Sequence, residues 1–198
     1  ALQLGSLPAR YRRSLEAFPD RAGFVQADPQ RVAHWQARLA DLGPKPKVGL
    51  CWRSMLLLTR RMAGYLALEE LAPLLESEAA TFVSLQYGLA EEEAAAIAGP
   101  LRGRLVSLDA EIDLTDDLDE VAALMTALDA VVTPSTTVAN MAGALGCRAY
   151  RFTSLEGSWI RLGTDGLPWY PRMQIFVAPA GTPLVDTWPQ IRAAMERD

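Results

Sequence analysis

Cysteine and histidine are scarce in this sequence, which argues against several kinds of site. The 198 residues include two cysteines and one histidine. Cys51 and Cys147 each lie in or beside an apolar run, which predicts buried, reduced thiols and makes a disulfide or a zinc site the less favoured interpretation. His34 falls on a predicted helix, far along the chain from the loops discussed below. A catalytic triad of serine, histidine and aspartate is therefore not expected.

The sequence also lacks an excess of positive charge and a long apolar run. It has 19 lysine and arginine residues against 24 aspartate and glutamate residues, a formal net charge of −5. This balance gives no general attraction for nucleic acids or anionic membranes. The longest apolar stretches are interrupted by Asp, Thr or Gly and fall short of the ~20 residues that a membrane span needs. With no signal peptide pattern either, we expect a cytoplasmic protein with no membrane span and no nucleic acid partner.

Two glycine motifs of nucleotide-binding proteins are absent. No G-x-G-x-x-G follows a predicted strand and no G-x-x-x-x-G-K-[ST] occurs, so neither a dinucleotide oxidoreductase nor a P-loop enzyme is supported. An acidic run spans residues 109–120. Four of its carboxylates fall in the first turns of a predicted helix: Asp116, Asp117, Asp119 and Glu120. Because carboxylates there complement the helix dipole, we interpret the run as a helix start and expect no metal site.

Hydrophobic residues make up 50% of the chain, and their spacing alternates between the periods of strands and helices. Short apolar runs typical of buried strands occupy residues 48–52, 81–86, 104–108, 130–133, 148–152 and 174–178. Helical patterns occupy residues 29–42, 68–76, 90–98, 116–128, 136–145 and 187–197. This alternation predicts an α/β, Rossmann-like domain with a largely parallel sheet and helices on both faces.

Local signals refine these elements. Asp28 as N-cap, Pro29 at the first helical position and Gly43 after the last turn delimit the first long helix. Pro73 falls inside the next helix, which it should kink or shorten. The first 20 residues look irregular, and the chain begins with Ala rather than Met. We interpret residues 1–27 as the linker or tail of a missing N-terminal domain, and residues 28–198 as the Rossmann-like domain, which carries the candidate ligand-binding loops described next.

Two of the loops that follow predicted strands carry residues suited to a nucleotide. Ligands of open α/β sheets bind at the carboxyl ends of the strands. After the first strand come Arg53, Ser54 and Arg60, and a guanidinium fork suits phosphate oxygens. A solvated surface loop is the alternative for Arg60. After the second strand, Gln86 and Tyr87 could hydrogen-bond and stack on a nucleobase, although Tyr87 could equally pack at the rim.

A third loop, after the strand at 130–133, carries three consecutive hydroxyls. These are Ser135, Thr136 and Thr137, at the start of a predicted helix. Capping of that helix is the simpler interpretation of one such hydroxyl. The remaining hydroxyls, the free N–H groups and the positive end of the helix dipole together predict an anion site suited to a pyrophosphate.

Several segments together resemble the C-terminal half of a GT-B glycosyltransferase. They are VGLCWRS, L-x-x-L-x-P-L-L, FVSLQYG, the stretch at 113–146 and PWYPRMQIF. The similarity covers residues 28–176, and T-T-x-A-x-x-A-G-A-L-G is its most specific part. The chain is most similar to the domain that follows tetratricopeptide repeats in bacterial proteins, some linked to flagellin glycosylation. It resembles heptosyltransferases and O-GlcNAc transferases more distantly.

The resemblance implies a nucleotide-sugar donor and no separate cofactor. The hydroxyls at 135–137 would contact the diphosphate, and Asn140, one turn further on, would lie near the ribose. Arg53 and Ser54 would match the phosphate-side loop after the first strand. Asn140 stands where heptosyltransferase-like sequences commonly have His, which leaves the donor identity open.

In such enzymes the other half binds the acceptor and usually supplies the base, so no catalytic residue is assigned. We expect the full-length protein to transfer a sugar, to a protein acceptor such as flagellin, and this chain alone to bind donor poorly and turn over little or nothing. The alternative is a degenerate GT-B-like domain that acts as a protein-interaction module, which a blocked loop at 135–140 would favour. A sugar-nucleotide epimerase has less motif support.

Overall fold

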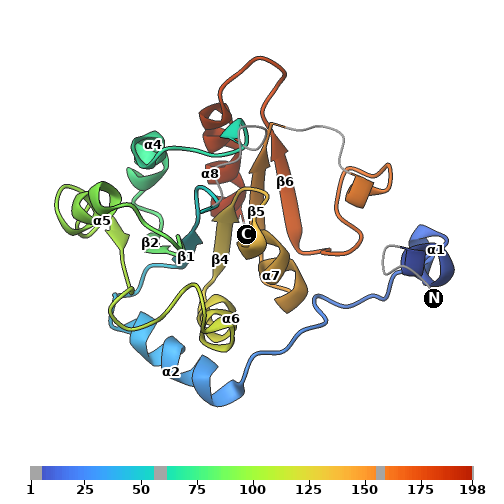
Figure 1. Ribbon diagram of the computed structural model, residues 1–198, viewed down its shortest axis with the longest axis horizontal. Coiled ribbons are helices and arrows are strands. Elements are labelled where there is room, and N and C mark those ends of the chain that lie inside the picture. The colour runs from blue at the N-terminus through green and yellow to red at the C-terminus, as the bar shows by residue number, and fades with distance from the viewer. Residues whose placement is uncertain (1–5, 56–61, 155–158, 198) are drawn as a thin grey trace.

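The computed structural model describes residues 6–55, 62–154 and 159–197. Its centre is a six-stranded sheet in the order β3-β2-β1-β4-β5-β6 (Figure 1). The strands are β1 (Lys47–Leu50), β2 (Thr81–Ser84), β3 (Leu105–Val106), β4 (Ala130–Thr133), β5 (Ala149–Thr153) and β6 (Met173–Val177). Every neighbouring pair in this sheet is parallel, which confirms the predicted fold class.

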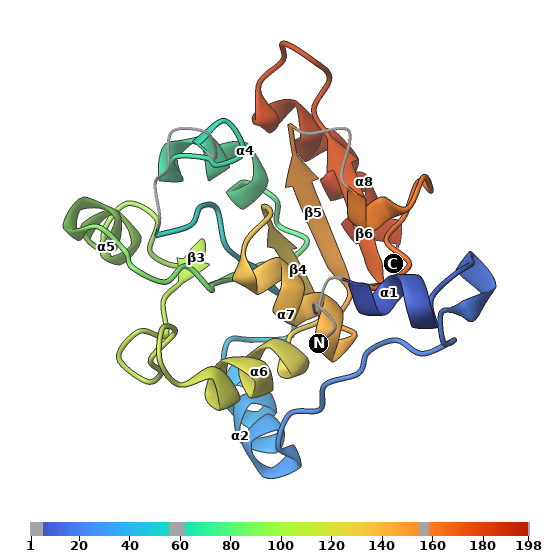
Figure 2. The ribbon, with the colours of Figure 1, turned by 45° about the vertical axis from the view of Figure 1, so that its right-hand side comes forward.

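Helices cover both faces of the sheet, as predicted (Figures 1 and 2). One face carries α4 (Ala72–Leu75), α5 (Glu91–Ala98) and α8 (Trp188–Arg197), whereas the other carries α2 (Pro29–Ala40), α6 (Leu118–Ala127) and α7 (Thr137–Leu145). Successive side chains of each strand belong to opposite cores, as the period of a strand requires. Leu50 and Val132 join the first core, and Cys51 and Val131 join the second.

The helix ends follow the sequence signals, with corrections at three helices. The helix expected at 29–42 is α2, which ends at Ala40. Asp28 Oδ1 accepts hydrogen bonds from the backbone N of Gln30 at 2.8 Å and of Arg31 at 3.0 Å, as an N-cap should. The helix expected at 68–76 is divided into a 3-10 turn, Leu68–Leu71, and the short α4, which begins beside Pro73. The helix expected from residue 116 begins at Leu118, because the carboxylate of Asp117 caps it by accepting from Glu120 N at 3.1 Å.

The first predicted strand is also shorter than expected. β1 ends at Leu50, since the backbone N–H groups of Trp52 and Arg53 leave the sheet and both donate to Gln86 Oε1 at 3.0 Å. Three further 3-10 turns occupy Leu15–Ala17, Trp159–Arg161 and Leu184–Thr187.

The segment before α2 is more ordered than predicted and crosses the end of α7. It contains α1 (Leu7–Tyr11). Further on, the backbone N–H groups of Phe24 and Val25 donate to Ala144 O at 2.7 and 2.9 Å. A Cβ on Gly23 would lie 2.5 Å from the backbone N of Gly146, so only glycine permits this crossing of two backbones. The Phe24 ring stacks on that of Tyr170, with centroids 6.4 Å apart.

Other sequence-based expectations concern isolated residues. Cys51 and Cys147 are both free thiols, the first buried and the second half-buried. His34 is exposed on α2. No helix in the described ranges has the length and apolarity to cross a membrane.

Candidate functional site

Two of the loops selected from the sequence meet at the centre of the sheet. The chain runs outward from β1 to β2 and β3, then returns to place β4 beside β1 and continues to β5 and β6. Ligands of open α/β sheets bind at such a reversal of strand order. The loops after β1 and β4 are therefore neighbours, and Cys51 Sγ lies 4.0 Å from Thr136 Oγ1.

The first turn of α7 leaves its hydrogen-bond donors free. Thr136 occupies the N-cap position, but its hydroxyl makes no cap bond. The hydroxyl is buried and lies 3.2 Å from Thr133 Oγ1 instead. As a result, the backbone N–H groups of Thr137, Val138 and Ala139 have no hydrogen-bond partner among the described residues. Three parallel donors at the positive end of a helix dipole form an anion-binding arrangement.

The loop that leads into α7 is open to solvent rather than sealed. Ser135, Thr137 and Asn140 are exposed, whereas Thr136 is buried. Asn140 Oδ1 accepts a long hydrogen bond of 3.5 Å from the Tyr170 hydroxyl. The exposed side chains of Ser135 and Thr137 thus flank the first turn of α7, whereas Val138 and Ala139 are buried.

Arg151, which the sequence analysis did not select, lies beside this turn. It is on β5 opposite Thr133 of β4, is 9% exposed, and its Nη2 donates to Ser135 Oγ. Its Nε is buried without a hydrogen-bond partner, and Arg151 forms no ion pair within the described part of the chain. Burial lowers the pKa of Arg151, and interaction with Tyr170 opposes this only in part. An arginine near the end of an apolar predicted strand was the available signal.

Arg53 was expected to bind a phosphate, but in the structure its guanidinium is bonded to another side chain. Its Nε donates to Glu93 Oε1 at 3.0 Å, and its Nη2 donates to Glu93 Oε2 and to Gly88 O. Trp52 Nε1 donates to the same carboxylate at 2.9 Å. Burial raises the pKa of Glu93, but the hydrogen bonds from Arg53, Ala90 N and Trp52 outweigh it, and the net pKa is lowered. The Arg53 fork is thus occupied by a carboxylate of α5.

Gln86 is likewise occupied. It is 1% exposed, and its carbonyl oxygen accepts from Trp52 N and Arg53 N while its Nε2 donates to Tyr87 O at 2.8 Å. The side chain therefore joins the ends of β1 and β2. Ser54 is buried, and its hydroxyl accepts a 3.5 Å bond from the Tyr87 hydroxyl. Arg60 lies outside the described residues.

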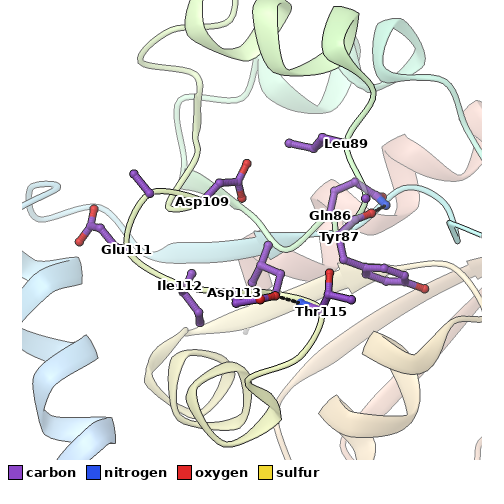
Figure 3. Close-up of a pocket in the computed structure, with 11 residues that line it drawn as sticks. Gln86, Tyr87, Leu89, Asp109, Glu111, Ile112, Asp113 and Thr115 are labelled. Carbon is purple, nitrogen blue, oxygen red and sulfur yellow. Dashed lines mark hydrogen bonds between the residues drawn. The ribbon is translucent and has the colours of Figure 1, made fainter.

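Tyr87 lies between two pockets. The larger has a volume of about 520 Å³. Figure 3 shows Gln86 and Tyr87 at the right, Asp109 and Glu111 at the left, and the loop at 109–115 running below to Thr115, close to Tyr87. In that loop, backbone N–H groups of Thr115 and Asp116 donate to Asp113 and lower its pKa. The smaller pocket, of about 140 Å³, is mainly apolar and adjoins the start of α7. It is lined by Met55, Tyr87, Leu114, Thr115, Leu118, Val121, Thr137, Val138 and Met141.

The site can therefore accommodate a ligand with two different ends. The α7 amides and Arg151 attract anionic oxygens, and the Tyr87 pocket accepts a flat apolar group on the other side of the helix start. Within the described residues, no cluster of three or more His, Cys, Asp or Glu side chains could hold a metal ion.

Comparison with curated proteins finds a relative that matches most of this chain. No family model matches the chain. The chain is 44% identical over 174 residues to Protein FlbA of Caulobacter vibrioides, an alignment that covers 88% of this chain and 29% of that protein. It thus spans less than a third of the relative's length.

Two solved glycosyltransferase structures share the fold. Escherichia coli ADP-heptose LPS heptosyltransferase II has a TM-score of 0.57 and 14% identity over 94% of this chain and 58% of its own. The glycosyl transferase family 9 protein of Veillonella parvula has a TM-score of 0.60 and 11% identity over 90% of this chain and 54% of its own. At such identities the likeness concerns the fold alone, and the chain has a GT-B-like glycosyltransferase fold.

Proposed function

We propose that this chain is the donor-binding half of a glycosyltransferase, and that it holds a nucleotide-sugar. The observation that carries the proposal is the first turn of α7 at the strand-order reversal, where three amides have no hydrogen-bond partner among the described residues and the side chains of Ser135 and Thr137 are exposed. A phosphate there gains hydrogen bonds from these amides and the attraction of the helix dipole, and no described residue has to give up a hydrogen bond to them.

The remaining candidates divide into contacts and supports. Ser135 and Thr137 add hydroxyls beside the phosphate, and exposed Asn140, one turn further along α7, faces the ribose. Tyr87 contacts the base from the apolar pocket that Thr137 and Val138 also line. Arg53 and Gln86 do not contact the donor; their hydrogen bonds position the loop after β1. The α7 amides then stabilise the nucleotide phosphate that departs when the bond to the anomeric carbon breaks.

The whole protein's acceptor belongs to the same proposal. The solved glycosyltransferases extend well beyond the part that this chain matches, so we assign the acceptor and the catalytic base to a second half. The resemblance to domains that follow tetratricopeptide repeats supports a protein acceptor such as flagellin and a location in the cytoplasm.

A degenerate domain that binds another protein is the second candidate function. It is favoured by Arg53 and Gln86, whose polar groups are already used within the chain. The exposed side chains of Ser135, Thr137 and Asn140 argue against it, because a blocked loop at 135–140 is what would favour a degenerate domain. The two candidates differ in whether nucleotides bind at α7.

The test is an NMR titration of the isotope-labelled chain with the mono- and diphosphates of adenosine, guanosine, cytidine and uridine. NMR detects millimolar binding, which suits the weak affinity expected of one half of the enzyme. We expect one base series to move the backbone resonances of Thr137, Val138 and Ala139. If none of the eight compounds moves them at millimolar concentration, donor binding is excluded and the interaction module is favoured.

A further inference from the structure

Arg151 is a buried cation without a counter-ion in the described part of the chain. Its guanidinium contacts one neutral hydroxyl, that of Ser135, and its Nε has no partner. A buried charge in that condition is unfavourable unless an anion arrives to pair with it. Ser135 directly precedes the N-cap of α7, so the guanidinium is held at the edge of the anion site described above.

The strand order places Arg151 on a particular side of that site. Tyr87 follows β2, and Arg151 lies on β5, so in the strand order the two residues stand on opposite sides of β1 and β4. A ligand whose base contacts Tyr87 and whose first phosphate binds the α7 amides therefore points its remaining part toward Arg151. That part is the sugar side of the donor.

We propose that Arg151 binds a second anionic group of the donor, beyond the phosphate held by α7, and so selects donors that carry one. The inference rests on the proposed function. A guanidinium fork accepts phosphate and carboxylate oxygens alike. The group is the second phosphate of a nucleoside diphosphate sugar, or the carboxylate of an acidic sugar linked to a nucleoside monophosphate.

The experiment measures selectivity rather than affinity alone. Binding of each nucleoside monophosphate and diphosphate, and of CMP and CMP-N-acetylneuraminic acid, is titrated against the native chain and Arg151→Met. Methionine keeps the apolar stem and removes the charge. Arg148→Met is the matched control, since Arg148 directly precedes β5, at the amino end of the strand and away from the candidate site.

The native chain should bind the ligand with a second anion about tenfold more tightly than its partner without one. In Arg151→Met this preference should fall to about twofold or less, while affinity for the plain monophosphate changes by less than about twofold. Preference for diphosphates identifies a second phosphate, and preference for the acidic sugar nucleotide identifies a carboxylate. Arg151→Lys, which keeps the charge but not the fork, should retain part of the preference.

Three results would overturn the inference. The preference could persist in Arg151→Met, or affinity for monophosphate and diphosphate could fall equally, which would assign Arg151 to the first phosphate. If Arg151→Met does not fold, the Nε resonance of Arg151 in the native chain replaces it, and a resonance that the ligand with the second anion does not move counts against the inference. If no nucleotide moves the α7 amides even in the native chain, the proposed function itself fails.

Discussion

Thr137→Pro separates the hydrogen-bond donors of α7 from the stability of the helix. Thr137 is the first residue of α7, a position where proline fits because its missing N–H has no helical partner. Thr136, with φ −125° and ψ −177°, already has the extended backbone that a residue before proline requires. The substitution thus deletes one of the three free amides and leaves the helix intact.

Thr137→Pro should weaken nucleotide binding without lowering the free energy of unfolding. One hydrogen bond to a charged phosphate contributes about 1.5–3 kcal/mol, so Thr137→Pro should weaken nucleotide binding by about 10-fold to 150-fold. The free energy of unfolding should stay the same or rise by up to about 1 kcal/mol, because proline restricts the unfolded chain and no native bond is lost.

Thr137→Ala is the control, since it removes the hydroxyl and keeps the N–H. The affinity of both variants is measured by NMR titration or calorimetry, and their stability by urea unfolding. Equal affinity in Thr137→Pro and Thr137→Ala would show that the amide does not contact the ligand. A stable Thr137→Pro with native affinity would refute the anion site at α7.

Three other predictions follow from the packing. Glu93→Gln should leave Arg53 unpaired and lower the free energy of unfolding by about 2–4 kcal/mol at pH 7. The pKa of Glu93 is lowered in the folded chain, so this loss of unfolding free energy should shrink as pH falls below the ordinary carboxyl pKa of about 4.3. Equal shifts of the urea midpoint at pH 7 and pH 3 would contradict the prediction. Burial raises the pKa of the Cys51 thiol to about 11, so iodoacetamide at pH 8 should label it slowly until the chain is denatured, and rapid native labelling seen by mass spectrometry would be inconsistent with that burial. Gly23→Ala should destabilise the chain by about 1–3 kcal/mol and make residues 6–27 sensitive to limited proteolysis. Gly166→Ala is the control: a Cβ there meets no atom within 4 Å and the backbone φ is not positive, so the proteolytic pattern should stay unchanged.

The strand and helix alternation was predictable because it depends on local periodicity and capping. Asp28 and Pro73 are signals that act within one turn, and the structure confirms their effects on α2 and α4. The loops after β1, β2 and β4 could be assigned to one end of the sheet because parallel strands have their carboxyl ends there. That β4 lies beside β1, and not beside β3, is known only from the strand order of the structure.

The occupancy of the polar side chains was not predictable, because it depends on partners far along the chain. Arg53 finds its carboxylate 40 residues away, on a helix whose packing sets the distance. Gln86 is used by backbone groups more than 30 residues earlier, at Trp52 and Arg53. Arg151 was not selected because it lies within a predicted strand rather than in a loop, and its place beside the candidate site depends on Ser135, which follows the neighbouring strand β4.

The crossing at Gly23 and Gly146 bears on how α7 can tolerate open donors at its other end. Ala144, in the last turn, has its carbonyl saturated by two backbone donors from residues 24 and 25, and Gly143 lies against the Tyr170 ring. These contacts hold the C-terminal end of α7 in place. Its N-terminal end therefore does not need a side-chain cap to keep the helix in position. The unpaired N–H donors at the start of α7 are therefore preorganised, and a ligand that binds them does not have to order the helix first.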